Sequence, residues 1–153
     1  MTKIGDLLGE QADRLARDII NIGDVHLLIL DESNGITPKD GEATRNKFFV
    51  VLGFDKEGNV IGGLVINSNI NHRLPRTITD YQLPVTVSQC PFLKHNSYVN
   101  CSRLITAERS KFNKSTYKGT ISDSELMGQI IGTVKESPTA NKKMLKDFGI
   151  DAT

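Results

Sequence analysis

Hydrophobic residues form three short runs in the first half of the chain, and polar, turn-forming residues separate these runs. They occupy residues 25–30, 47–54 and 60–67, and each is rich in the β-branched and aromatic side chains that favour strands. Residues 55–59 form a short polar connection with a glycine, as in a hairpin. The pattern predicts three successive strands, the second and third of them antiparallel.

A polar segment, residues 31–46, connects the first two predicted strands. It is rich in glycine, asparagine and charged residues and contains a proline, so we expect no regular structure in it. Connections of this length in compact domains often carry function. The end of this loop is therefore the first place to look for a site.

The later part of the chain alternates less regularly. Residues 77–88 favour a strand, but Pro84 interrupts them, which predicts an edge strand or a bulge. Residues 97–105 alternate apolar and polar side chains and predict one further strand. The sheet should therefore gain at least two strands after the first three.

Helices are predicted at both ends. In residues 2–20, apolar positions recur at helical spacing, which predicts an amphipathic helix covering the core or a partner. Ser122 and Glu125 have capping-box spacing before an apolar stripe that stops at Pro138. Residues 139–148 predict a short second helix, ended by Gly149.

The element order indicates one α+β domain, mostly β with helices. A chain of 153 residues fits a single core. We divide it into an N-terminal helix extension (1–22), a barrel and helix core (23–136) and a C-terminal helix extension (137–153). Short strands closed by a terminal helix favour a small, strongly bent sheet or a partly open barrel.

Positive charge is concentrated in the middle of the chain, although the net charge is only +1. Residues 1–42 hold nine acidic and four basic side chains, residues 43–118 four and eleven, and residues 119–153 five and four. A phosphate-binding face explains this asymmetry, and so does a solvated surface that has no partner.

The cysteines and the hydropathy pattern bear on compartment and cofactors. No run reaches the roughly 18 apolar residues of a membrane span, and the N-terminus lacks signal-peptide order. Cys90 and Cys101 show no CxxC spacing, and a metal site that adds His95 would lack a fourth ligand. We expect a cytoplasmic protein with no membrane association, no metal and no cofactor.

Five segments, taken in order, carry a resemblance to a known family. They are Gly-Asp-Val-His-Leu-Leu-Ile-Leu-Asp at 23–31, the lysine-led strand at 47–53, the Asn/Ser end of the third strand, Tyr-Val-Asn-Cys-Ser-Arg-Leu-Ile-Thr at 98–106 and Gly-Thr-Ile-Ser-Asp-Ser-Glu-Leu at 119–126. Over residues 23–134 this order resembles the MazF/PemK (Kid) toxins of toxin–antitoxin modules. The resemblance implies a small Src-homology-type β-barrel, a homodimer, metal-independent cleavage of single-stranded RNA, and an antitoxin whose flexible tail fills the RNA groove.

Several family motifs are replaced in this chain. Lys47-Phe48 stands where the family has an Arg-Pro pair, and Asn67-Ser68 stands where a Thr or Ser closes the third strand. Asn100 and Ser102 flank Cys101, where the Kid branch has Arg and Asp. Ile36 follows Gly35, where that branch has His. These replacements keep open a non-catalytic member of the same fold that binds nucleic acid or a partner peptide, and also an assembly protein unrelated to RNA.

Cleavage of RNA by its own 2′-hydroxyl needs a base, a cation for the charged phosphorane and an acid for the leaving oxygen. Histidine exchanges protons near neutral pH, which suits the acid or base role. With the family resemblance, the two neighbouring strand ends supply the catalytic candidates Arg45, Lys47, Asn67, Ser68 and His72. Their plainer interpretations are solvated strand-end charges, a turn or strand cap, and a surface-loop histidine.

Further basic residues extend this candidate surface. A basic run near Phe112 and Tyr117 would combine phosphate contact with stacking, or would simply solvate a loop. His26, inside an apolar strand, is interpreted as structural. The candidate RNA-binding residues are Arg73, Arg76, Arg103, Arg109 and Lys111.

Overall fold

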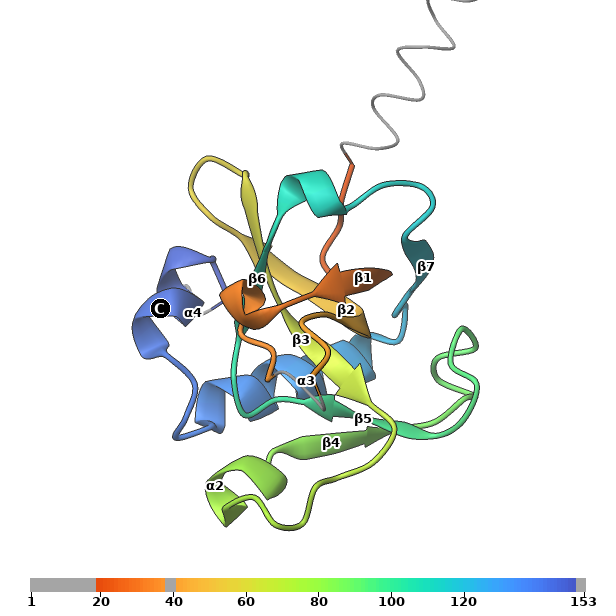
Figure 1. Cartoon of the computed structure of the whole chain (residues 1–153), viewed down its shortest axis with the longest axis vertical. Coiled ribbons are helices and arrows are strands. Elements are labelled where there is room, and N and C mark those ends of the chain that lie inside the picture. Colours follow the sequence, from red (N-terminus) through yellow and green to blue (C-terminus); the bar gives the residue numbers. More distant parts are fainter. Residues whose placement is uncertain (1–18, 38–40, 151–153) are drawn as a thin grey trace, which may run out of the picture.

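The structure is a computed structural model, and it describes residues 19–37 and 41–150 (Figure 1). The helix predicted over residues 2–20 lies outside this range except for its last two residues. The described part is a small α+β fold with a mostly antiparallel sheet and three α-helices. Its elements are β1 (Asp24–Leu30), η1 (Glu32–Asn34), β2 (Arg45–Phe54), β3 (Val60–Asn67), α2 (Arg76–Thr79), β4 (Gln82–Val85), β5 (Ser97–Asn100), β6 (Ile105–Glu108), η2 (Arg109–Lys111), β7 (Tyr117–Thr120), α3 (Ser124–Glu136) and α4 (Lys142–Asp147).

The first three strands form the predicted antiparallel meander. Leu28 of β1 is opposite Lys47 of β2, and Phe48 of β2 is opposite Ile66 of β3. The β2–β3 connection is the expected hairpin, in which Gly58 takes a φ of 75°. Both predictions, three successive strands and an antiparallel β2–β3 pair, are confirmed.

The remaining strands extend this meander on both sides. β7 pairs with β1, whereas the far side of β3 is shared between β6 at its start and β5 at its end. β4 follows β5, giving the order β4-β5-β3-β2-β1-β7. Among the described residues, no recorded pairing joins the two ends of this path into a closed barrel.

Residues 77–88 form less strand than the sequence predicts. The chain makes the short helix α2 first, because Pro75 has the fixed φ that suits the start of a helix. β4 then pairs only with β5, so Pro84 lies in an edge strand, where its missing N–H costs no ladder bond. The edge-strand prediction is confirmed, and the strand is shorter than expected.

The single strand predicted over residues 97–105 is wrong. β5 ends at Asn100 and β6 begins at Ile105, and the two pair with different halves of β3. The Asn100 side chain explains the break: its Oδ1 accepts hydrogen bonds from the backbone N of Ser102 at 3.1 Å and from the Ser102 hydroxyl at 2.5 Å. Such a side-chain turn competes with continued pairing.

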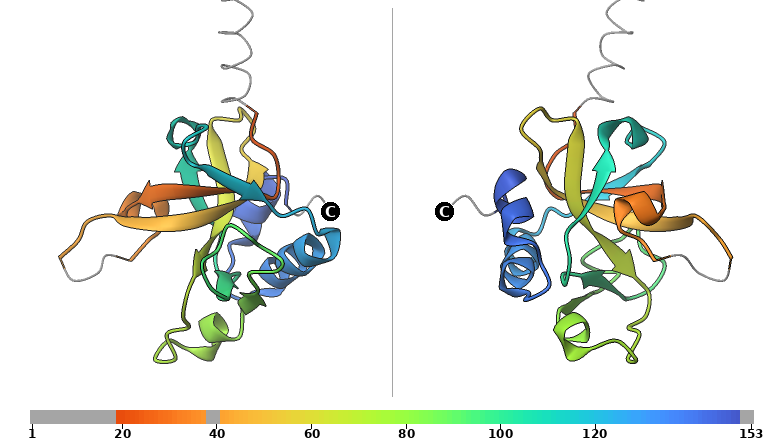
Figure 2. Two further views of the ribbon diagram at one scale, coloured as in Figure 1. Left: turned by 90° about the vertical axis from the view of Figure 1, so that its right-hand side faces the viewer. Right: turned by 60° about the vertical axis from the view of Figure 1, so that its left-hand side comes forward.

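Two hydrophobic clusters cover the two faces of the sheet. On one face, Leu64 and Val50 pack with Ile130 of α3 and Leu145 of α4. On the other, Phe49 is in one cluster with Ile36, which follows η1, and Phe112, which follows η2. Figure 2 shows α3 and α4 together on one side, with the β1–β2 loop extending on the opposite side. The helices α3 and α4 therefore cover the first face and not the second.

The C-terminal helices form as predicted, but with different starts. Asp123, and not Ser122, caps α3: its side chain accepts from the backbone N of Glu125 and of Leu126. The predicted apolar stripe is confirmed, since Leu126, Ile130 and Val134 are buried. α4 is shorter than predicted, because Asn141 caps it. In residues 19–37 and 41–150, no helix has the length and apolar composition needed to cross a membrane.

Candidate nucleic-acid interface

Polar side chains from three neighbouring strands lie next to one another at the end of β3. Lys47 of β2 donates a hydrogen bond from Nζ to Asn67 Oδ1 of β3 at 2.5 Å. Asn67 is in turn the direct cross-strand partner of Tyr98 on β5. All three side chains are half-buried. The two strand ends singled out from the sequence therefore do lie side by side.

Strand alternation places this cluster on the face opposite α3 and α4. Lys47 is two residues from Phe49, which is fully buried in the cluster on that face, so both project the same way. Phe49 is covered by Phe112, whose ring centroid is 5.4 Å away, and Lys47 is the next residue on this face toward the start of β2. This face is thus apolar at Phe49 and polar at Lys47, near the start of β2.

The polar row continues across β5 to β4. Gln82 Nε2 donates to Asn100 Oδ1 at 2.9 Å and to the Ile78 carbonyl at 3.1 Å, which fixes both carboxamides. Tyr98 and Asn100 alternate on one face of β5. We call Lys47, Asn67, Tyr98, Asn100 and Gln82 the strand-end row.

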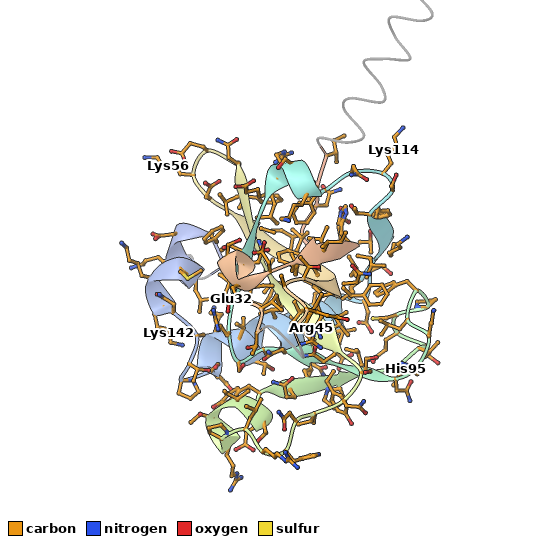
Figure 3. The ribbon with its side chains drawn as sticks, viewed as in Figure 1. Glu32, Arg45, Lys56, His95, Lys114 and Lys142 are labelled. Carbon is orange, nitrogen blue, oxygen red and sulfur yellow. The ribbon has the colours of Figure 1, made fainter. Side chains whose placement is uncertain are left out.

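Two arginines border the strand-end row. Arg45, two residues before Lys47 on β2, is half-buried, and in Figure 3 it lies near the centre of the view. Arg103 follows the β5 turn, and its guanidinium lies against Gly35, where an added Cβ would come within 2.8 Å of Nη2. Arg45 thus places a cation at the start of β2, two residues before Lys47, and Arg103 places one against the β1–β2 loop.

The β1–β2 loop is tied down beside Arg103. Asp31 caps η1 through Ser33, and Gly35 takes a φ of 99°. Asn34, which is buried, donates from Nδ2 to the Thr106 carbonyl of β6 at 3.1 Å. The hydrogen bonds to Ser33 lower the pKa of Asp31. This part of the loop is thus held against β6.

The candidate residues after β3 stand apart from the row. Ser68, His72, Arg73 and Arg76 are exposed on the segment that leads into α2. Arg76 pairs with Asp80, with Nε and Oδ2 3.3 Å apart. Within the described range, no hydrogen bond joins His72 to the strand-end row. His72 is therefore close to the row in the sequence but is not bound to it in the structure.

Arg109 and Lys111 occupy other parts of the surface. Arg109 Nη1 donates to the Gly58 carbonyl at 3.0 Å, in the hairpin at the opposite end of β3. Lys111 Nζ donates to the Ile29 carbonyl at 3.1 Å, on the outer edge of β1. The basic run predicted from the sequence is thus divided, with Arg109 at the β2–β3 hairpin, Lys111 at β1 and Arg103 against the β1–β2 loop.

A second polar site was missed by sequence reasoning. A cavity of about 370 Å³ lies over the paired strands β1 and β7, and its lining includes Asp24, His26, Tyr117 and Thr120. Burial lowers the pKa of His26, partly opposed by the Asp24 carboxylate. The available signal was two polar residues at alternate positions of an apolar strand, which share one face.

The cysteines take no part in either site. Both are free and buried, and burial raises the pKa of Cys101 to about 12. A thiol so far from ionisation is a poor nucleophile and a poor metal ligand. Within residues 19–37 and 41–150, no group of three or more His, Cys, Asp or Glu side chains is placed to hold a metal ion.

Compared with models of known protein families and with curated proteins, the chain matches none. The chemistry of the site therefore rests on its own residues. The strand-end row offers an ammonium group, carboxamides and a half-exposed tyrosine ring between two arginines. Ammonium and guanidinium groups contact phosphates, whereas amides and aromatic rings hydrogen-bond and stack with unpaired bases.

Proposed function

We propose that this chain is a MazF/PemK-like toxin, a metal-independent endoribonuclease that binds single-stranded RNA across the strand-end row. The observation that carries the proposal is the Lys47–Asn67 hydrogen bond, which joins a cation and a polar side chain from the two strand ends. Three features support a small Src-homology-type barrel: the β1–β2–β3 meander, the pairing of β3 with both β5 and β6, and the helix α3. A homodimer and a cognate antitoxin are part of the same proposal.

RNA binding follows from the side chains of the row and its border. Lys47 and Arg45 contact the backbone phosphates, and their half-buried position strengthens these charge interactions over those of a fully exposed lysine. The Tyr98 ring provides a surface for one base, and the carboxamides of Asn100 and Gln82 hydrogen-bond to base edges.

Cleavage would use the Lys47 end of the row. The 2′-hydroxyl attacks the adjacent phosphorus, the 5′-oxygen leaves, and a 2′,3′-cyclic phosphate forms. Lys47 stabilises the charge that develops on the phosphorane oxygens, and Asn67 orients the phosphate. His72 then acts as acid or base from the segment that follows Asn67, which requires this segment to close over bound RNA.

The test is incubation of purified chain with single-stranded RNA of varied sequence in EDTA. We expect fragments ending in cyclic phosphate, and a loss of rate of about 100-fold or more in Lys47→Met. Lys56→Met is the matched control, since Lys56 is exposed in the β2–β3 hairpin at the other end of these strands (Figure 3). RNA that stays intact over the whole range of sequences would rule out the enzyme.

A second candidate function is RNA binding without cleavage. The observation in its favour is that Asn100 and Ser102 hydrogen-bond to each other, and that His72 is exposed outside the row. It predicts RNA affinity that falls steeply with salt and weakens in Lys47→Met, with no fragments formed. Binding and cleavage assays on the same RNAs separate the two functions.

A further inference from the structure

The cavity over β1 and β7 is lined by hydroxyl groups that donate hydrogen bonds toward the Asp24 carboxylate. Thr120 Oγ1 donates to Asp24 Oδ1 at 2.8 Å. Because that bond uses the single hydroxyl hydrogen of Thr120, the 2.6 Å contact between Tyr117 Oη and Thr120 Oγ1 must have tyrosine as donor. The chain Tyr117–Thr120–Asp24 thus ends on a carboxylate, and the phenol oxygen keeps only acceptor capacity for a ligand.

His26 adds another acceptor. Its Nδ1 is 2.8 Å from Thr116 Oγ1, and this hydroxyl donates to the Asn113 carbonyl at 3.0 Å. The histidine must therefore donate from Nδ1, which leaves the lone pair on Nε2. Because burial lowers the pKa of His26, the neutral ring with this tautomer is the form present at neutral pH.

The cavity also has an aromatic wall and a size suited to a small ligand. Tyr117 is 42% exposed, and its ring lies 5.6 Å from that of His26. The volume of about 370 Å³ falls in the range of small-molecule sites, roughly 300–1,000 Å³. Asp24 is only 6% exposed, so a ligand that reaches its carboxylate is largely removed from water.

We propose that this cavity binds a planar ligand with adjacent N–H donors, of which the guanine base is the representative. Asp24, the Tyr117 oxygen and His26 Nε2 accept from the N–H groups, and the Tyr117 ring packs on the plane. The guanidinium group has the same donor pattern. Asp24 and Lys114 give the lining one carboxylate and one ammonium group, so the titration below includes both a neutral base and a guanidinium compound.

The site is separate from the strand-end row. Asp24 and His26 lie at the start of β1 beside β7, whereas Lys47 is opposite Leu28 and the row runs away from β1 through β3 and β5. The inference therefore does not rest on RNA cleavage, and it can fail or succeed without changing that proposal.

The experiment is titration of the full chain with guanosine, adenosine and agmatine, followed by calorimetry and by NMR shifts of the Thr120 amide. We expect guanosine to bind at least 10-fold more tightly than adenosine. Asp24→Asn should weaken guanosine binding at least 10-fold, because it replaces an acceptor pair by an amide. Tyr81→Phe, a tyrosine outside the cavity, is the control and should change nothing.

A second variant keeps the test independent of folding effects at Asp24. Thr120→Val removes the acceptor of the Tyr117 hydroxyl, which is then able to donate into the cavity, so the preference for guanosine over adenosine should fall. Agmatine binding with loss in Asp24→Asn would assign the donor pattern to guanidinium ligands. No binding of any of the three compounds, or guanosine binding equal in all variants, would overturn the inference.

Discussion

His26 shows how a single residue changes meaning between sequence and structure. Its apolar neighbours indicate a structural histidine, and its ring does pack edge-on against Phe112, with centroids 4.9 Å apart. The same side chain also lines the β1–β7 cavity. Sequence reasoning missed the second role because β7 lies about ninety residues away and nothing local announces that it pairs with β1.

The lowered pKa of His26 predicts a pH dependence of stability. The unfolded chain binds the proton with the ordinary pKa of 6.5, and the folded chain binds it less readily because the ring is buried. The contribution of neutral His26 to the free energy of unfolding is therefore complete above pH 6.5. It is lost as the pH falls below 6.5 through the folded pKa. Urea unfolding at pH 7.5 and pH 5.5 measures the loss.

The controls for this prediction are histidine variants. His26→Gln should show a smaller fall in unfolding free energy between the two pH values than the unmodified chain. His95→Gln, at an exposed position, should show the same fall as the unmodified chain. Equal pH dependence in the His26→Gln variant and the unmodified chain would contradict a lowered pKa.

The strand-end row divides into a part that the sequence predicts and a part that it does not. Lys47 and Asn67 were found because the family resemblance pointed to these strand ends and a hairpin brings the far ends of its two strands together. The sequence did not predict the bulge between Val51 and Gly53, which shifts the register by one residue. Tyr98 and Gln82 were missed because they lie on β5 and on its neighbour β4. The pairing of β5 with the end of β3 depends on the turn after Asn100. Contacts that depend on a local turn can be predicted from the sequence, and contacts that depend on tertiary pairing cannot.

At the scale of elements, apolar runs locate the strands well and polar side chains decide their ends. β3 has the predicted limits, and β1 and β2 differ from theirs by one and two residues. The errors fall where Asn100 and Pro75 end or begin an element through their own geometry. Hydrophobic periodicity does not carry this information.

The start of α3 provides a direct test of such an end. The sequence predicts Ser122 as the cap, whereas in the structure the cap is Asp123, whose Oδ1 accepts from Glu125 N at 2.9 Å. Asp123→Ala should therefore lower the unfolding free energy by about 1 kcal/mol (range 0.5–2). Ser122→Ala should leave it within about 0.5 kcal/mol, since Ser122 is exposed. Chemical denaturation of both variants decides, and the reverse order would restore the capping box.

At the scale of the whole molecule, the sheet separates two tasks. One face is closed by α3 and α4, which bury Leu64, Val50 and Leu52. The other is covered only as far as Phe49 and then presents the strand-end row. Because α3 and α4 are confined to one side, the opposite face can carry polar groups without loss of the core (Figure 2).

The helix α4 is packed into the core on the first face, although the sequence analysis assigns residues 137–153 to a C-terminal extension. Leu145 is fully buried with Ile130 of α3 in one cluster, and the Phe148 carbonyl accepts from Phe54 N of β2 at 3.2 Å. Gly53 is needed there, because a Cβ would lie 2.1 Å from that carbonyl oxygen. The helix therefore shares its packing with the central strands.

We accordingly expect Leu145→Ala to destabilise the entire chain and not only its end. The variant leaves a cavity in the shared core and should lower the unfolding free energy by about 2–5 kcal/mol in a single denaturation transition. Lys143→Ala, exposed on the same helix, controls for helix propensity and should stay within about 0.5 kcal/mol. A separate early transition in Leu145→Ala, with the sheet unfolding as in the unmodified chain, would mean that α4 unfolds independently of the sheet. A single shifted transition would mean that the sheet carrying the strand-end row depends on α4 for its stability.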